Sequence, residues 1–427
     1  MQGTASNNAP SSSVVIPHFI TGAVIWLLCM ILLFCNTDAL MGHFFNFKLL
    51  SINHLLVLSW VTTIIFGALY QLLPVILLCK LYSERLAILS FIFLQVGSIG
   101  MSVCFWNGLT GIPLISTGSV VCLAMLFFGF NLMKTILRSS VVRIEKTFIA
   151  TAVFWLFFTV LIGLLLAINF QFPFLTFPHV ELLKVHAHFG VIGWFSQLII
   201  GVASVLIPMF LLSHTTSKRG LMICYVLLNG SLLVGFFSKM SAFETGLICS
   251  LLMGVLGLFF FLRFIYQTYR ARVKKKLDIG MKKSMIAFLF ALLAIVFSIP
   301  SFVQQIKGFE IPETAYFTTL IIGFVSTLIM GQTYKTLPFI IWLNTYKSVV
   351  GKEKTPLPRD LYSDTIARWQ YRIHSIGFLV VLTGITLHYQ PVLQAGIGCL
   401  LIAGILYLKN VLTLLFHKRK HNEFSTY

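Results

Sequence analysis

Residues 54–74 read HLLVLSWVTTIIFGALYQLLP, and residues 186–208 read HAHFGVIGWFSQLIIGVASVLIP. Both stretches contain the spacing His-x5-Trp-x6-Gly-x6-Pro, and the two copies lie 134 residues apart. A third stretch keeps the glycine and the proline as Gly331 and Pro338, but it has Thr318 at the histidine position. The pattern predicts one structural unit that occurs three times. The two full sets are His54, Trp60, Gly67, Pro74 and His188, Trp194, Gly201, Pro208.

The composition around these copies is that of a membrane protein. Apolar residues make up 58% of the 427-residue chain and charged residues only 10%, and the mean hydropathy is +0.93. About twelve apolar stretches are long enough to cross a hydrocarbon core of roughly 30 Å. We therefore predict an all-α membrane protein with about twelve transmembrane helices, in which equivalent helices of the three units lie four apart.

Basic residues are distributed unevenly between the two sides of this twelve-helix arrangement. Of the 31 Lys and Arg residues, only Lys48, Lys184, Lys239 and Lys307 fall on one side, while Lys282 and Lys283 belong to a basic loop on the other. This asymmetry predicts that both termini are cytoplasmic. We therefore expect the basic residues behind the net charge of +19 to set the orientation of the helices and to contact anionic lipid headgroups of the bilayer. We do not expect them to bind nucleic acid.

The domain organisation follows from the same apolar pattern. Residues 1–15 are rich in Ser and Asn without Lys or Arg, and we expect a disordered tail. Residues 16–416 form a single membrane domain of three related four-helix units, at about 18–140, 147–272 and 283–416. Residues 417–427 form a basic cytoplasmic tail. The eight cysteines show no paired spacing and are expected to be small core residues.

Helical geometry separates the repeated residues into two groups. At about 1.5 Å per residue, the 20 residues from histidine to proline cover about 30 Å, so each copy is one crossing. At roughly 100° per residue, the tryptophan, glycine and proline fall on one face, while the histidine points some 120 to 160° away. The first face is explained by close helix packing. The histidine, at matched depth near the outer surface, indicates a site.

Four histidines are the candidate site residues. His54 and His188 occupy the repeated position, and both are candidate cofactor and metal ligands. His186 is a further candidate cofactor and metal ligand. It lies about 200° from His188 around the helix axis, so the two do not readily bind one metal; they face two cavities, or one is a ligand and the other a packing residue. His388, near the outer end of the eleventh helix, is a further cofactor candidate.

The segment His188-Phe-Gly-Val-Ile-Gly-Trp194, followed by Gly201 and Leu-Ile-Pro208, resembles helices of the heme-copper oxidase subunit I superfamily. It is most similar to the nitric oxide reductase and C-family oxidase branch and to NnrS-type membrane proteins. The resemblance implies twelve helices in a pseudo-threefold bundle. It also implies heme ligands on the second and tenth helices and copper-binding histidines on the sixth and seventh.

The chain departs from this ligand set. His54 matches the second-helix ligand, and His186 or His188 lies on the sixth helix. The tenth helix, however, has Tyr316, Phe317 and Thr318 where two histidines are expected, and the seventh helix contains no histidine. A complete heme-copper active site is therefore not evident, and the resemblance leaves open whether the chain is an oxidoreductase.

From these observations we predict a membrane heme-binding protein, with copper as a weaker expectation, related to heme-copper oxidase subunit I. His54 and His188 are the expected axial ligands, because neutral imidazole commonly ligates heme iron. The expected role is respiratory electron transfer or the handling of nitric oxide or oxygen in a bacterial inner membrane, with cytochrome c or a second oxidase-type subunit as partner. The alternative is a non-enzymatic transporter or assembly factor for heme, copper or a small solute.

Overall fold

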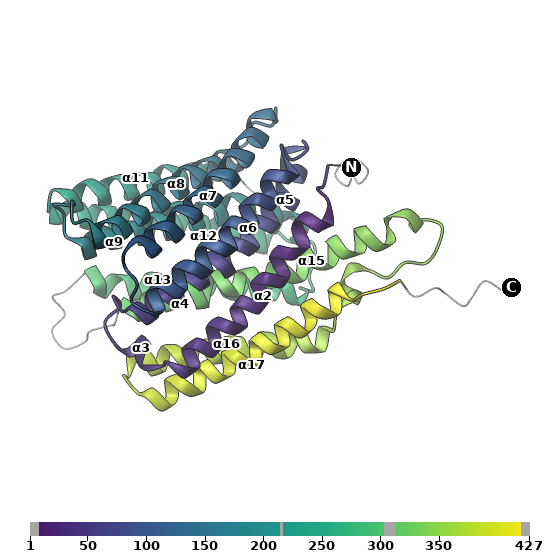
Figure 1. Ribbon diagram of the computed structural model, residues 1–427. Coiled ribbons are helices and arrows are strands. Elements are labelled where there is room, and N and C mark those ends of the chain that lie inside the picture. The colour runs from purple at the N-terminus through teal and green to yellow at the C-terminus, as the bar shows by residue number, and fades with distance from the viewer. Residues whose placement is uncertain (1–7, 214–216, 303–312, 420–427) are drawn as a thin grey trace.

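The computed structural model describes residues 8–213, 217–302 and 313–419, and within these ranges the chain is helical and contains no β-strand. Most helices are long and run along a common direction, and α2 begins at the end of the bundle where α17 ends (Figure 1). Eleven helices of the described chain are long and apolar enough to cross a membrane. The protein is thus an all-α, multi-pass integral membrane protein whose outer helices contact the lipid bilayer.

The membrane helices follow one another with short connections. They are α2 (Ser12–Cys35), α4 (Phe47–His54), α5 (Thr63–Leu77), α6 (Glu84–Trp106), α7 (Ile112–Arg138), α8 (Ile144–Gln171), α9 (His179–His188), α10 (Gln197–Leu211), α11 (Arg219–Met240), α12 (Glu244–Arg270), α13 (Ile279–Phe302), α14 (Glu313–Thr318), α15 (Thr327–Tyr346), α16 (Asp364–Thr386) and α17 (Gln390–Leu415). Short helices α3 (Asp38–Met41), η4 (Lys347–Val349) and η5 (Pro358–Leu361) lie in connections.

The structure differs from the predicted helix boundaries in two details. Helix α2 begins at Ser12, and Val14 and Val15 are buried, so the last residues of the expected tail 1–15 are helical, while residues 1–7 lie outside the described residues. Helix α16 is 23 residues long, but its charged first half keeps it out of the eleven apolar helices. The polar stretch from Asn344 to Tyr371 forms the end of α15, two short helices and the start of α16.

Each repeated stretch is one long helix whose middle is π-helical. The π segments are η1 (Leu55–Thr62), η2 (Phe189–Ser196) and η3 (Thr319–Ser326), and each begins directly after the histidine position. Hydroxyl side chains bond carbonyls five residues earlier, as Thr62 Oγ1 does to Val57 O (2.8 Å) and Ser196 Oγ to Val191 O (2.8 Å). These bonds satisfy carbonyls in the widened turns, and such turns often mark functional sites.

The glycine of each copy lies where the first helix of the same unit crosses. A Cβ at Gly67 would lie 2.6 Å from His18 Cβ on α2, one at Gly201 would lie 3.0 Å from Phe148 Cβ on α8, and one at Gly331 would lie 2.9 Å from Lys283 Cβ on α13. The absence of a side chain therefore lets the two helices approach closely, as predicted for the packing face. Helices α5, α10 and α15 meet around a small apolar cavity of about 100 Å³.

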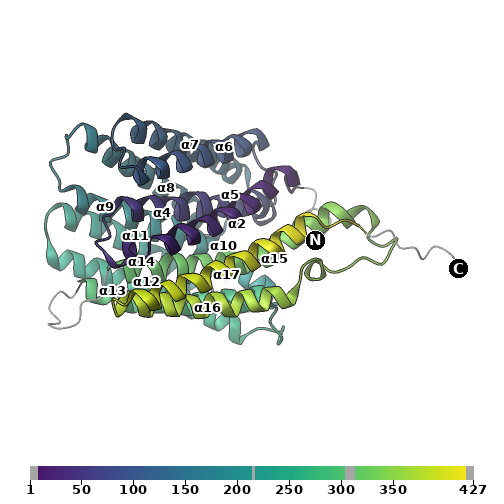
Figure 2. The same ribbon diagram turned by 60° about the horizontal axis from the view of Figure 1, so that its bottom comes forward.

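The junctions between successive units are not alike. Helix α7 packs closely on α8, and α17 packs closely on α2. Helices α17 and α2 lie side by side in both views (Figures 1 and 2). Helix α12, in contrast, barely touches α13, although the two are consecutive in the chain. The junction between α12 and α13 is thus looser than the two that resemble it.

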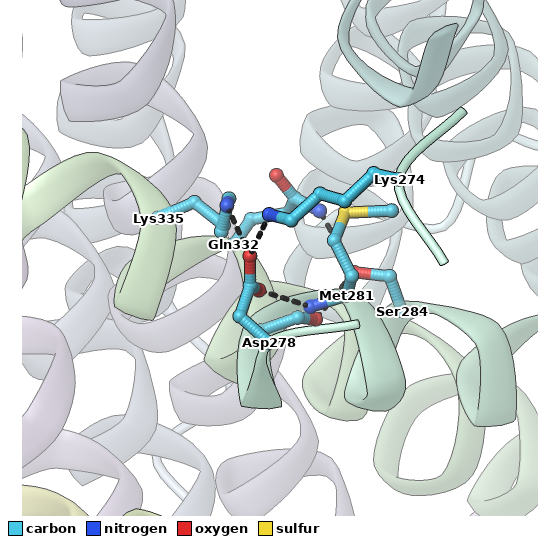
Figure 3. Close-up of polar contacts among 7 residues, drawn as sticks. Lys274, Asp278, Met281, Ser284, Gln332 and Lys335 are labelled. Carbon is cyan, nitrogen blue, oxygen red and sulfur yellow. Dashed lines mark hydrogen bonds and ion pairs between the residues drawn. The ribbon is translucent and has the colours of Figure 1, made fainter. Parts of the chain in front are cut away.

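An ion-pair cluster joins the start of α13 to α15 (Figure 3). Asp278 Oδ2 accepts hydrogen bonds from Lys274 Nζ (2.9 Å) and Lys335 Nζ (2.7 Å), while its Oδ1 accepts one from Met281 N (3.0 Å). Burial alone would raise the pKa of the carboxyl group, but Lys335, Lys274 and the Met281 N–H together outweigh it and lower the pKa to about 2. Asp278 is therefore a firmly ionised acceptor that fixes the α12–α13 connection against α15.

Candidate cofactor cavity

A cavity of about 1070 Å³ lies at the end of the bundle where the repeated histidines are found. Its volume is at the upper end of the range typical of small-molecule and cofactor sites, roughly 300 to 1,000 Å³. His54, His186 and His188 all line it, together with many apolar and aromatic side chains. The structure thus brings together three of the four histidines predicted from the sequence.

His54 and His188 have the same local geometry in the two copies. The Nδ1–H of His54 can donate to Leu50 O (2.7 Å), and that of His188 to Lys184 O (2.8 Å), four residues earlier in each helix. With Nδ1 protonated, the Nε2 lone pair of each ring is free, and neither Nε2 has a hydrogen-bond partner among the described residues. A backbone carbonyl that orients the ring through Nδ1 is the usual support of a ligating histidine.

His186 is oriented by a different helix. Its Nδ1 lies 2.8 Å from Thr159 O on α8, and its ring lies against Gly163, where a Cβ would come within 2.9 Å of His186 Cε1. Thus Gly163 leaves the space that the imidazole ring fills. His186 is close enough to His54 to interact with it electrostatically, whereas Lys239 and Glu313 act on His188.

The cavity therefore has two parts on the two sides of α9. We call the first lobe the part lined by α4, α6, α7 and α8, which contains His54 and His186. We call the second lobe the part lined by α11, α12, α13 and α14, which contains His188. The sequence left open two cavities, or one ligand and one packing residue, for His186 and His188; both residues line a single cavity.

The predicted division into a packing face and a histidine face is only partly correct. Trp60 is buried away from the cavity, and its Nε1 donates to Ser326 Oγ (3.0 Å). Trp194, however, lines the same cavity as His188, and its buried Nε1–H has no partner. The angles were calculated for a regular α-helix, but the histidine and the tryptophan are separated by a π-helical segment, which turns less per residue.

The third copy contributes neutral polar groups where the others contribute histidine. Thr318, Tyr316 and Thr314 all line the second lobe. The Thr314 hydroxyl is buried without a hydrogen-bond partner, and Tyr316 has no hydrogen bond among the described residues. The hydroxyl groups of these residues can donate or accept hydrogen bonds at the cavity wall.

His388 does not belong to the cavity. It is exposed in the turn after α16, with a left-handed backbone (φ 48°), and it does not line the space that holds the other three histidines. Within the described chain, no three side chains of His, Cys, Asp or Glu gather to hold a metal ion. The described residues therefore do not supply a copper site of the kind that the resemblance implies.

Charged side chains at the outer end of the cavity form ion pairs with one another. Lys184 Nζ lies 3.4 Å from Glu313 Oε1 and 3.9 Å from Glu181 Oε1, and Lys239 pairs with Glu181. These contacts link α9 to α11 and α14. Two lysines and two glutamates compensate each other here, while Glu244 at the start of α12 also lines the cavity and has no ion pair among the described residues.

A second buried polar cluster was not recognised from the sequence. Lys283 was placed in a basic loop, but it lies in α13, is fully buried and donates to Gln370 Oε1 on α16. His374, one turn further along α16, is 2.9 Å from Thr327 Oγ1 through Nε2. Lys283 follows Lys282 and a basic loop in the sequence, and this position does not indicate that it is buried. Only the glycine spacing of α15 could have indicated that a helix packs against it.

No family model matches this chain, and a comparison with curated proteins finds no significant match.

Proposed function

We propose that the protein is a membrane heme-binding protein whose heme is held in the first lobe by His54 and His186. The observation that carries this proposal is the pair of imidazoles in one lobe, each with Nδ1 engaged by a backbone carbonyl and Nε2 free. Neutral imidazole nitrogen in this state is a normal axial ligand of heme iron. The large, mainly apolar cavity fits a flat hydrophobic cofactor.

The proposed ligand pair is different from the pair expected from the repeat alone. His188 has the same local geometry as His54, but it lies on the side of α9 that faces Lys239 on α11 and Glu313 on α14. His186 lies close to His54, and both line the cavity. We therefore assign His186, and not His188, as the partner of His54. Bound heme would supply electron transfer or the binding of a small gas such as nitric oxide or oxygen.

The proposal includes a topology and a location. We infer twelve crossings, with α16 as the one outside the eleven apolar helices, in a pseudo-threefold bundle with both termini in the cytoplasm. The basic asymmetry of the loops supports this orientation. The corresponding location is a bacterial inner membrane, with a c-type cytochrome or a second oxidase-type subunit as electron partner.

The test is the heme content of protein purified in detergent after expression with added heme precursor. A pyridine hemochromogen spectrum should show one heme per chain in the parent and in His388→Ala, since His388 is exposed and outside the cavity. The double variant His54→Ala, His186→Ala should lose it. A parent without heme would refute the function, and a double variant that keeps heme would refute the ligand assignment.

A second function is favoured by the third copy. Thr318 replaces a histidine, and α11 brings no histidine to the cavity, so the chain lacks the ligands that a catalytic heme-copper centre needs. A protein of this kind would store or deliver heme instead of reducing a gas. Heme that passes to apomyoglobin within minutes would favour delivery, whereas heme that stays bound through repeated redox cycles would favour electron transfer.

A further inference from the structure

The junction between α12 and α13 borders the second lobe and has exposed apolar residues on its outer side. In the two corresponding junctions, α7 packs on α8 and α17 packs on α2, but α12 barely touches α13. Residues of both helices line the cavity, among them Leu251 and Val255 on α12 and Ala291 and Ile295 on α13. We call this apolar opening the seam. It is continuous with the second lobe, because both belong to one cavity.

The seam is bordered by residues that face lipid. Leu252 on α12 is 62% exposed and Val296 on α13 is 57% exposed, whereas the neighbouring Val255 and Ala291 are half-buried. A space between such helices in a bilayer admits hydrocarbon chains and excludes water. The seam thus fits the apolar chain of a molecule that is dissolved in the membrane.

The inner end of the seam meets hydrogen-bonding groups that have no partner. The Thr314 hydroxyl is buried and unpaired, Tyr316 forms no hydrogen bond among the described residues, and His188 Nε2 is free as an acceptor. All three residues line the second lobe. Of these groups only the Thr314 hydroxyl is fully buried, where lacking a partner among the described residues is costly, while Tyr316 and His188 are half-buried. Together the three side chains offer a ligand both hydrogen-bond donors and an acceptor.

The charges around the lobe favour an uncharged ligand head. Lys184 and Lys239 are already paired with Glu313 and Glu181, so no cation is left over for a phosphate or a carboxylate. Phe236, Phe317 and Tyr316 also line the lobe and offer aromatic surfaces to a flat ring. A phospholipid head lacks this complementarity.

We propose that the second lobe and the seam bind a membrane quinone or quinol. Its oxygen-bearing ring lies at Thr314, Tyr316 and His188, and its apolar chain lies between α12 and α13. A quinone accepts hydrogen bonds from the two hydroxyl groups, and a quinol donates one to His188 Nε2. This site does not depend on heme in the first lobe.

The test is equilibrium binding of decylubiquinone to the full-length protein in phosphatidylcholine nanodiscs, corrected for partition into empty nanodiscs. The parent should bind it saturably. The double variant Thr314→Val, Tyr316→Phe should raise the Kd about tenfold, since it removes two hydrogen bonds. Ala291→Trp, which fills the seam, should raise the Kd similarly, and the lipid-facing control Val296→Trp should leave it within about twofold.

A second measurement protects the test against misfolded variants. An azidoquinone bound to the parent should label peptides of α12, α13 or α14, and excess decylubiquinone should suppress this labelling. The proposal is overturned if the parent shows no saturable binding, if labelling falls on other helices, or if well-folded variants bind like the parent. It is equally overturned if purified protein retains a phospholipid that the quinone cannot displace.

Discussion

At the scale of single residues, the position of the His186 ring depends on one glycine. A methyl group at position 163 would lie 2.9 Å from His186 Cε1, so Gly163→Ala should push the ring away from Thr159 O. Loss of the hydrogen bond that orients a ligating histidine typically lowers metal affinity 10- to 100-fold. We therefore expect the Gly163→Ala variant to bind hemin about tenfold more weakly than the parent. Hemin titration of the apoprotein, followed by the Soret band, measures this.

The matched control is Gly118→Ala. Gly118 lines the same cavity, but a methyl group there would meet its nearest neighbour, Leu164 Cδ1, at 3.6 Å, which is ordinary van der Waals contact. Its hemin affinity should equal that of the parent. Equal weakening by the two substitutions would show that the cavity tolerates no added volume anywhere, and would contradict a specific role of Gly163.

Asp278 predicts a dependence of stability on pH. Its pKa in the folded protein is about 2, below the ordinary value of 3.8 for an aspartate, so its ionised form stabilises the fold above about pH 4. This stabilisation is lost as the pH falls through about 2. Asp278→Asn should cost about 2 kcal/mol at neutral pH, because it weakens charged hydrogen bonds to Lys274 and Lys335. Thermal unfolding in detergent at several pH values measures the difference.

The difference between parent and Asp278→Asn should be constant from pH 5 to 7 and should shrink between about pH 4 and 2. Asp38→Asn removes the same charge at an exposed residue that has no ion pair among the described residues, and it should match the parent throughout. A difference that persists unchanged to the lowest pH would mean that packing, and not the carboxylate charge, supports the cluster.

The depth of a residue along a helix could be predicted from the sequence. His54, His186 and His188 do line one cavity, because repeated spacing at a fixed depth carries that information. Lys283 was misplaced in a loop, whereas His388 lies at the predicted end of its helix but outside the cavity. The turn that leaves His388 exposed and the helix crossing that buries Lys283 both depend on tertiary contacts, which local composition does not encode.

At the scale of helices, the repeated glycines are the clearest link between sequence and packing. A methyl group at Gly331 would lie 2.9 Å from both Gly280 O and Lys283 Cβ, and neither a backbone oxygen nor a Cβ moves without moving its helix. We expect Gly331→Ala to destabilise the protein by about 1 to 3 kcal/mol, as overpacked cores do. The fraction that remains monodisperse after heating in detergent reports this loss.

Gly398→Ala is the control for this substitution. A methyl group at position 398 on α17 would come no closer than 3.6 Å to Phe34 Cε2, so the variant should keep the stability of the parent. If Gly331→Ala were as stable as Gly398→Ala, the close approach of α13 and α15 would not be a packing constraint. The spacing of the glycines would then need another explanation.

The same helices show where sequence reasoning reached its limit. Period and length predicted one crossing for each repeated stretch, and each stretch lies in one helix that is long and apolar enough to cross a membrane. The π-helical segments were not predicted, because they depend on side-chain hydroxyls that bond a carbonyl five residues back, such as Ser196 to Val191 O. Serine and threonine are too common in membrane helices for their presence alone to indicate a π turn.

At the scale of the whole molecule, the topology rests on α16. Its charged first half, including Asp364, Arg368 and Arg372, keeps it out of the eleven apolar helices, yet it packs along its whole length on α17. If α16 crosses the membrane, as we propose, the turn that carries His388 lies outside and the start of the helix lies inside. If α16 lies on the surface, both of its ends lie on one side.

Cysteine labelling in intact cells separates these two arrangements. His388→Cys places a thiol in an exposed turn, and Thr365→Cys places one at the other end of α16. With twelve crossings, a membrane-impermeant maleimide should label position 388 in intact cells but position 365 only after permeabilisation, each compared with the parent because Cys35 and Cys249 are also exposed. Labelling of both positions in intact cells would place both ends of α16 on the outer side of the membrane. This result would contradict the proposal that α16 is one of twelve crossings.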